Sequence, residues 1–129
     1  MELAFEKLGG LIPAIIQEYG TGEVLMLGFV NGESLALTQN SGEVYFFSRS
    51  RNKLWKKGET SGHVLKVKEI RVDCDGDALL IRVEAAGPGV CHEGYRTCFF
   101  RELESDGNAR VVEEPAFDAR SIYGKKGAE

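Results

Sequence analysis

The sequence has no apolar run long enough to cross a membrane and no excess of positive charge. A membrane-spanning helix needs about 20 consecutive apolar residues. The first six residues carry two acids, where a signal peptide would carry basic residues before an apolar block. The formal net charge of -4 argues against a nucleic-acid backbone as the main partner. We therefore expect a cytoplasmic protein with neither a membrane nor a nucleic acid as its partner.

Cysteine is also scarce, and its number is odd. Three cysteines occur among 129 residues, so they cannot all pair within one chain. In a reducing compartment, thiols more often act as metal ligands, nucleophiles or buried apolar groups than as disulfides. A chain of this length can bury a core without disulfides, and no repeat, low-complexity block or linker divides it. The sequence therefore predicts a single domain whose core does not depend on disulfides.

Short apolar and β-branched runs predict strands along most of the chain. We expect strands at residues 11–16, 23–30, 43–47, 64–72 and 78–83. The first should lie at a sheet edge, because Pro13 cannot donate to a central ladder. A helix is expected between Asn31, a good N-cap, and Gly42, a C-terminal stop. The turn signal Asp75-Gly76 predicts a hairpin between the last two strands.

A basic loop follows the expected strand at residues 43–47. Residues 48–62 hold five of the sixteen basic side chains, interleaved with hydroxyls and glycines. Arginine forms forked hydrogen bonds with phosphate oxygens, while serine, threonine and glycine let further donors approach closely. The loop is therefore a candidate anion-binding site, and a solvated basic loop is the alternative.

All three cysteines lie between residues 73 and 98, at Cys74, Cys91 and Cys98. Three thiolates suit zinc and leave a fourth position for water or substrate. The spacing from Cys91 to Cys98 is wider than that of the two-residue zinc knuckle, and buried apolar cysteines are the alternative. His92 is the candidate general base or proton shuttle, and His63 is a weaker candidate by its position.

Three aspartates surround Cys74. If the preceding strand stays extended, Asp73, Asp75 and Asp77 share one side and Cys74 lies on the other. Oxygen ligands at alternate positions suit magnesium or calcium, and a solvated acidic turn is the alternative. An EF-hand calcium loop is a further alternative, but Ala78 stands where that loop requires glycine.

Four motifs follow one another along the chain. They are Ser48-Arg49-Ser50-Arg51, Leu54-Trp55 with Lys57-Gly58-Glu59-Thr60-Ser61-Gly62, Asp73-Cys74-Asp75-Gly76-Asp77, and Cys91-His92-Glu93-Gly94 with Cys98-Phe99. Together they closely resemble the phosphoribosyl-AMP cyclohydrolase family of histidine biosynthesis, over roughly residues 11–103. The departures from the family pattern are Phe47 for tryptophan, Val90 for alanine and Thr97 for serine. None of these three positions is a proposed ligand.

The resemblance implies a mainly β (α+β) fold with a buckled, barrel-like mixed sheet and one or two short helices. Residues 1–108 would form the cyclohydrolase domain, and residues 109–129 a C-terminal tail that ends loosely from Gly124 onward. The family resemblance also implies an intertwined homodimer. Its zinc site would be shared, with Cys74 from one chain and Cys91 and Cys98 from the other.

The implied reaction is hydrolysis of the N1–C6 bond of 1-(5-phosphoribosyl)-AMP, which requires Zn²⁺ and Mg²⁺. Zinc at the three cysteines would lower the pKa of bound water from about 15.7 toward 7, so that a hydroxide attacks C6. His92 would transfer protons, and Asp73, Asp75 and Asp77 would hold magnesium. The residues implied to bind the substrate, including its two phosphates, are Ser48, Arg49, Ser50, Arg51, Lys57, Glu59, Thr60 and Ser61.

Two other classes stay open on the residues alone. A non-catalytic, zinc-stabilised binding module would keep the cysteines without needing the basic loop or His92. A nucleotide deaminase would also use zinc, but its usual signature contains Cys-x-x-Cys, and this sequence has none.

Overall fold

A computed structural model describes residues 1–123, so the predicted loose end from Gly124 lies outside the described residues. In chain order the elements are the 3-10 helix η1 (Phe5–Leu8), β1 (Ile12–Glu18), β2 (Val24–Val30), α1 (Gly32–Ser41), β3 (Tyr45–Ser48), β4 (Lys53–Lys56), β5 (Leu65–Val72), β6 (Leu79–Ala85), β7 (Arg101–Leu103), β8 (Ala109–Val111) and α2 (Ala119–Tyr123). Strands dominate, which confirms the prediction of a mainly β domain with few helices. Within residues 1–123, no helix has both the length and the apolar character that crossing a bilayer requires.

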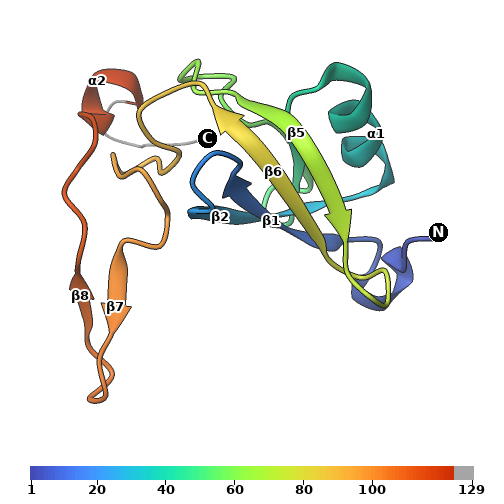
Figure 1. The fold of residues 1–129 in the computed structure, drawn as a ribbon, viewed down its shortest axis with the longest axis horizontal. Coiled ribbons are helices and arrows are strands. Elements are labelled where there is room, and N and C mark those ends of the chain that lie inside the picture. The colour runs from blue at the N-terminus through green and yellow to red at the C-terminus, as the bar shows by residue number, and fades with distance from the viewer. Residues whose placement is uncertain (124–129) are drawn as a thin grey trace.

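The main sheet has four strands in the order β2-β1-β6-β5 (Figure 1). β1 pairs antiparallel with β2 and parallel with β6, and β5 and β6 form an antiparallel hairpin. The predictions of a mixed sheet and of this hairpin are therefore confirmed. The sheet is open and not closed into a barrel, because β2 and β5 form its two edges.

The prediction that β1 is an edge strand is wrong. β1 lies between β2 and β6, although it contains Pro13. The ladder with β6 begins only at Ala14, which pairs with Leu79. Pro13 is therefore tolerated because it lies at the start of the strand, beyond the end of the neighbouring ladder.

Local signals account for the ends of α1. The side chain of Asn31 accepts a hydrogen bond from the Ser34 amide at 2.8 Å, and Ser34 Oγ accepts one from the Asn31 amide at 2.9 Å. This reciprocal capping box satisfies amides that a helix start otherwise leaves unpaired. Gly42 ends the helix with a left-handed φ of 77°. The predicted cap and stop are both confirmed.

The core lies on one face of the main sheet. Alternate β1 residues Ile12, Ala14 and Ile16 are fully buried there, because successive side chains in a strand point to opposite faces. Phe46 of β3 is buried as well, with its ring 5.2 Å from that of Trp55 in β4. β4 was not expected as a strand, and it turns the predicted loop at 48–62 into the β3–β4 hairpin followed by turns.

Residues after the main sheet form a further hairpin, β7–β8, which extends away from the sheet (Figure 1). The predicted domain boundary after residue 108 falls inside this hairpin. Beyond β8 the chain returns to the loop that follows β6. There the amides of Ala116 and Phe117 donate to the carbonyl of Gly94 at 2.7 and 3.1 Å.

Candidate functional site

The loop after β6 brings Cys91 and Cys98 together. Backbone hydrogen bonds fold it back on itself, from Val90 N to Arg96 O and from Cys91 N to Tyr95 O. A hydrogen bond from Cys98 and the backbone amide of Glu93 lower the pKa of Cys91 to about 6, against the opposing effect of burial. The same bond to Cys91, together with burial, raises the pKa of Cys98. The thiol of Cys91 therefore loses its proton readily, and the thiol of Cys98 keeps its proton.

Strand β2 anchors the end of this cysteine loop, defined here as residues 87–98. The Cys98 amide donates to the Leu25 carbonyl at 2.7 Å. Thr97 is buried, and its hydroxyl lies 2.9 Å from the Val24 carbonyl oxygen and 3.1 Å from that of Leu25. This anchoring explains why a residue with a hydroxyl group precedes Cys98. The sequence alone did not reveal that Thr97 has this role.

Two basic side chains hold the rest of the cysteine loop. Arg96 Nε donates to Glu23 Oε1 at 2.6 Å, and a terminal guanidinium nitrogen of Arg96 donates to Glu18 Oε1 at 3.3 Å. Lys57 is buried, and its Nζ donates to the Val90 carbonyl at 2.6 Å. Lys57 was expected to bind phosphate, but its ammonium points inward to the cysteine loop. Arg96 was missed, because the loop carries no signal for an ion pair with a distant hairpin.

Cys74 lies far from the other two cysteines. It is exposed in the turn between β5 and β6, while the cysteine loop begins at the other end of β6 (Figure 1). The seven residues of β6 span about 23 Å at roughly 3.3 Å per residue. Within residues 1–123, the one group of three or more potential ligands that converge is Asp73, Asp75 and Asp77.

The aspartates converge because the chain turns. Residues 73–78 form the β5–β6 turn, in which Asp73 Oδ1 accepts hydrogen bonds from the Asp77 and Ala78 amides at 3.0 and 3.3 Å. Gly76 takes a positive φ of 74°, which lets the chain reverse. Ligand atoms of the three carboxylates lie within 4.8 Å of one another. The extended geometry considered from the sequence therefore stops at Val72, and the turn gathers the carboxylates instead.

The ammonium of Lys7 contacts the aspartate turn, defined here as residues 73–78. Lys7 Nζ lies 3.3 Å from Asp75 Oδ2 and 3.1 Å from Asp77 Oδ2. Hydrogen bonds with Asp77 and Lys7 lower the pKa of Asp75. Lys7 also acts to lower the pKa of Asp77, but Asp75 and Asp73 outweigh it and raise that pKa. The turn thus has the negative charge and the oxygen ligands that a hard cation needs.

The two histidines occupy different surroundings. His92 is exposed on the cysteine loop. His63 is partly buried, with its ring against Gly87 and edge-on to Phe117 at 5.0 Å between centroids. Its Nδ1 atom is buried and has no hydrogen-bond partner among the described residues. His63 therefore packs beside the start of the cysteine loop, while His92 is the histidine open to solvent.

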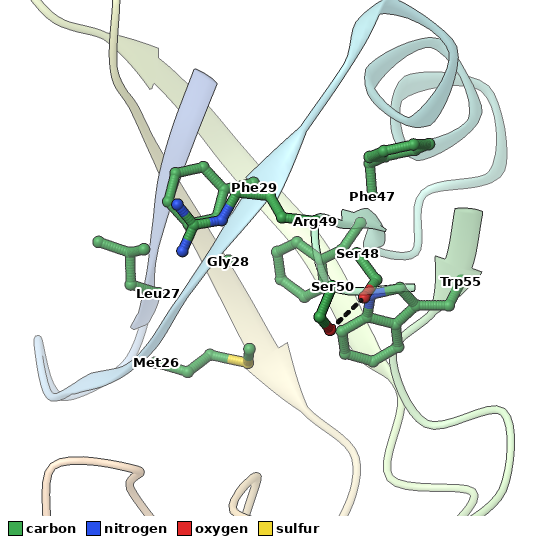
Figure 2. Close-up of a pocket in the computed structure, with 10 residues that line it drawn as sticks. Met26, Leu27, Gly28, Phe29, Phe47, Ser48, Arg49, Ser50 and Trp55 are labelled. Carbon is green, nitrogen blue, oxygen red and sulfur yellow. Dashed lines mark hydrogen bonds between the residues drawn. The ribbon is translucent and has the colours of Figure 1, made fainter. Parts of the chain in front are cut away.

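A cavity of about 540 Å³ lies between β2 and the β3–β4 hairpin (Figure 2). Its walls include aromatic rings and the start of the basic loop: Met26, Leu27, Gly28, Phe29, Phe46, Phe47, Ser48, Arg49, Ser50 and Trp55. The guanidinium of Arg49 stacks 3.9 Å above the centre of the Phe29 ring, and the hydroxyls of Ser48 and Ser50 lie 3.3 Å apart. The volume is in the range of small-molecule sites.

The other predicted phosphate-binding residues do not line this cavity. Arg51 is exposed in the β3–β4 turn, where its amide donates to Ser48 Oγ at 3.2 Å. Glu59 and Thr60 are exposed in the turns after β4, and Ser61 Oγ accepts a hydrogen bond from the His63 amide at 3.0 Å. The structure thus brings Ser48, Arg49 and Ser50 together and leaves the others outside the cavity walls.

Fold and site together define a small, mainly β domain with a cavity of small-molecule size and with thiol and carboxylate groups of the kinds that bind metal ions. A family model described as phosphoribosyl-AMP cyclohydrolase matches residues 26–100. A phosphoribosyl-AMP cyclohydrolase of Solibacter usitatus is 53% identical, covering 98% of this chain and 99% of the relative. The enzyme of that name from Desulfatibacillum aliphaticivorans is 54% identical over 97% of this chain and 99% of the relative.

The chain belongs to the phosphoribosyl-AMP cyclohydrolase family, the hydrolases of histidine biosynthesis that its motifs resemble. The predictions of the family and of a hydrolase are therefore confirmed.

Proposed function

We propose that this chain is a cytoplasmic enzyme that hydrolyses the N1–C6 bond of 1-(5-phosphoribosyl)-AMP and uses zinc and magnesium to do so. The observation that carries the proposal is the paired thiols of Cys91 and Cys98 on a loop anchored at several points. Family membership supplies the reaction, and the arrangement of this chain's residues supports the metals and their positions.

The thiol pair fits zinc by its donor chemistry. With its pKa lowered to about 6, Cys91 is a thiolate at neutral pH, and thiolates are the soft ligands that zinc prefers. Cys98 would be the second ligand and would lose its proton on metal binding, as coordinating thiols do. Bound there, zinc would act as a Lewis acid that makes water a nucleophile at neutral pH.

The third thiolate would be Cys74 of a second copy of the chain. One chain places its own Cys74 at the far end of β6, so it does not complete the site by itself. Cys74 is exposed, and so is the large apolar side chain of Phe99 next to Cys98. Burial of such apolar surface favours association. A homodimer would therefore hold zinc between Cys74 of one chain and Cys91 and Cys98 of the other.

His92 would move the proton in this reaction. Opening the ring forms a bond between a water oxygen and C6, breaks the C6–N1 bond, and requires one water proton to reach N1. Imidazole is the side chain that most often accepts and returns a proton in catalysis. His92 is exposed and directly follows Cys91, so its ring can meet a substrate bound at the cysteine loop.

The cavity beside β2 would bind part of the nucleotide. Arg49, Ser48 and Ser50 offer donors to phosphate oxygens, and the rings of Phe29 and Trp55 offer flat apolar surface to a purine. Arg51, Thr60 and Ser61 would offer donors to the second phosphate from the neighbouring turns, and Glu59, which only accepts hydrogen bonds, would contact another part of the substrate. The ammonium of Lys57 points to the cysteine loop and not to this cavity, so we do not assign it to a phosphate.

Magnesium would bind at the aspartate turn. Asp73, Asp75 and Asp77 supply the carboxylate oxygens that a hard cation takes as ligands. The ammonium of Lys7 contacts two of these carboxylates, so the metal would have to displace it.

The test is an assay of the purified protein with phosphoribosyl-AMP, in which the change of ultraviolet absorbance on ring opening is monitored. We expect a zinc chelator to abolish turnover, and added zinc but not added magnesium to restore it. Cys91→Ser should lose both bound zinc and ring opening, because serine offers a hydroxyl in place of the soft thiolate. A Cys91→Ser protein that keeps its full zinc content would contradict the ligand assignment. A wild-type protein that leaves the spectrum of the substrate unchanged would contradict the reaction.

A further inference from the structure

Lys57 is the one charged side chain that is buried among residues 1–123, with 4% of its surface exposed. An ammonium taken out of water costs free energy unless other groups compensate the charge. Its Nζ donates to the Val90 carbonyl oxygen at 2.6 Å and lies 5.9 Å from the centre of the Trp55 ring. Val90 immediately precedes Cys91, so the ammonium lies against the backbone of the cysteine loop.

The backbone fixes this inward direction. Lys57 directly follows β4, and its amide donates to the carbonyl of Val44 at 3.1 Å. The preceding residue, Lys56, has its ammonium 2.6 Å from Glu43 Oε1 in a partly exposed ion pair. Two adjacent lysines therefore point in different directions, one to a surface carboxylate and the other to the cysteine loop.

The positive charge of Lys57 also lies close to the proposed thiolate ligands, because its ammonium contacts the carbonyl of Val90, the residue before Cys91. Three thiolates exceed the two positive charges of a zinc ion by one negative charge. A partly buried site with a net negative charge is stabilised by a cation held close to it.

We propose that Lys57 is a positioning residue of the zinc site. Its ammonium fixes the loop that carries Cys91 through the Val90 carbonyl, and it balances the net negative charge of the thiolates. The inference rests on the proposed function, since it requires zinc at Cys91 and Cys98. It assigns Lys57 to the metal site and not to the phosphates of the substrate.

The test measures zinc affinity by competition with a chromophoric chelator, on the full chain. Lys57→Met removes both the charge and the donor, and we expect zinc to bind about 10- to 100-fold more weakly, as when other residues that support metal ligands are removed. Lys57→Gln keeps a donor without the charge and should also weaken binding. Lys57→Arg keeps the charge and should restore most of the affinity that Lys57→Gln loses.

Lys56→Met is the matched control, because it removes a neighbouring lysine whose partner is Glu43 on the surface. Its zinc affinity should stay within about twofold of the wild type, since exposed ion pairs contribute little. Equal affinities for Lys57→Arg and Lys57→Gln would overturn the proposal, because a purely structural lysine does not distinguish them. A Lys57→Gln protein that stays unfolded in excess zinc would also overturn it and would place Lys57 in the fold alone.

The two proposals fail in different ways. If the wild type binds no zinc, the proposed function fails first. If the wild type binds zinc and all Lys57 variants bind it equally well, only the role of Lys57 is overturned.

Discussion

His92 is exposed next to buried Cys91, so a change of its side chain leaves the packing of the cysteine loop intact. We expect His92→Ala to keep its zinc and to lose about 10²- to 10⁴-fold in kcat, the usual contribution of a general acid–base group. Metal analysis and steady-state kinetics on the same sample measure both. Asn108→Ala, in the exposed turn between β7 and β8, is the control and should keep its rate. A normal rate in His92→Ala would remove this residue from the mechanism.

Individual residues show where sequence reasoning stops. The soft thiol ligands of Cys91 and Cys98 and their match to the family motif predicted that these residues act together, whereas their spacing alone left buried apolar cysteines as the alternative. The direction of Lys57 could not be predicted in the same way. Its immediate neighbours are Lys56 and Gly58, and only the fold, which brings the Val90 carbonyl within reach of the residue after β4, turns its ammonium inward.

Gly28 lets strand β2 and the β3–β4 hairpin pack closely together. A Cβ atom at Gly28 would lie 2.5 Å from ring atoms of Phe46, which is buried and packed on Trp55. We expect Gly28→Ala to lower the free energy of unfolding by about 1–3 kcal/mol, the usual cost of an overpacked core. The midpoint of urea unfolding measures this loss.

Gly32→Ala is the matched control for that substitution. Gly32 begins helix α1, and no other residue lies within 4 Å of an added Cβ. Alanine is the better helix former, so this variant should keep or gain stability, by at most about 1 kcal/mol. If both variants unfold at the same urea concentration, the close contact between Gly28 and Phe46 does not limit stability.

Elements specified by neighbouring residues were predictable, and pairings between distant segments were not. The capping box at Asn31 and the turn at Asp75-Gly76 involve residues close in sequence, so their patterns can be read directly. The parallel pairing of β1 with β6 joins segments more than sixty residues apart. Nothing local to Pro13 indicates where the β6 ladder begins, and for that reason the edge-strand prediction was wrong.

At the level of the whole molecule, the open sheet keeps Cys74 and the cysteine loop at opposite ends of β6. The positions of the three cysteines in the sequence do not by themselves say whether one chain holds all three proposed zinc ligands, and the prediction of a shared site came from the family resemblance. The separation within one chain supports a site shared between two copies. Subunit exchange between inactive variants can test that arrangement.

Mixing Cys74→Ala with Cys91→Ala protein under subunit exchange should restore ring opening, because each mixed dimer contains one complete set of cysteines. Random pairing makes half of the dimers mixed and repairs one of their two sites, so about a quarter of wild-type activity should return. Mixing Cys91→Ala with Cys98→Ala is the matched control and should restore nothing, because both ligands belong to the same loop. If the first mixture stays as inactive as the second, although mass spectrometry shows that the subunits have exchanged, the site lies within one chain.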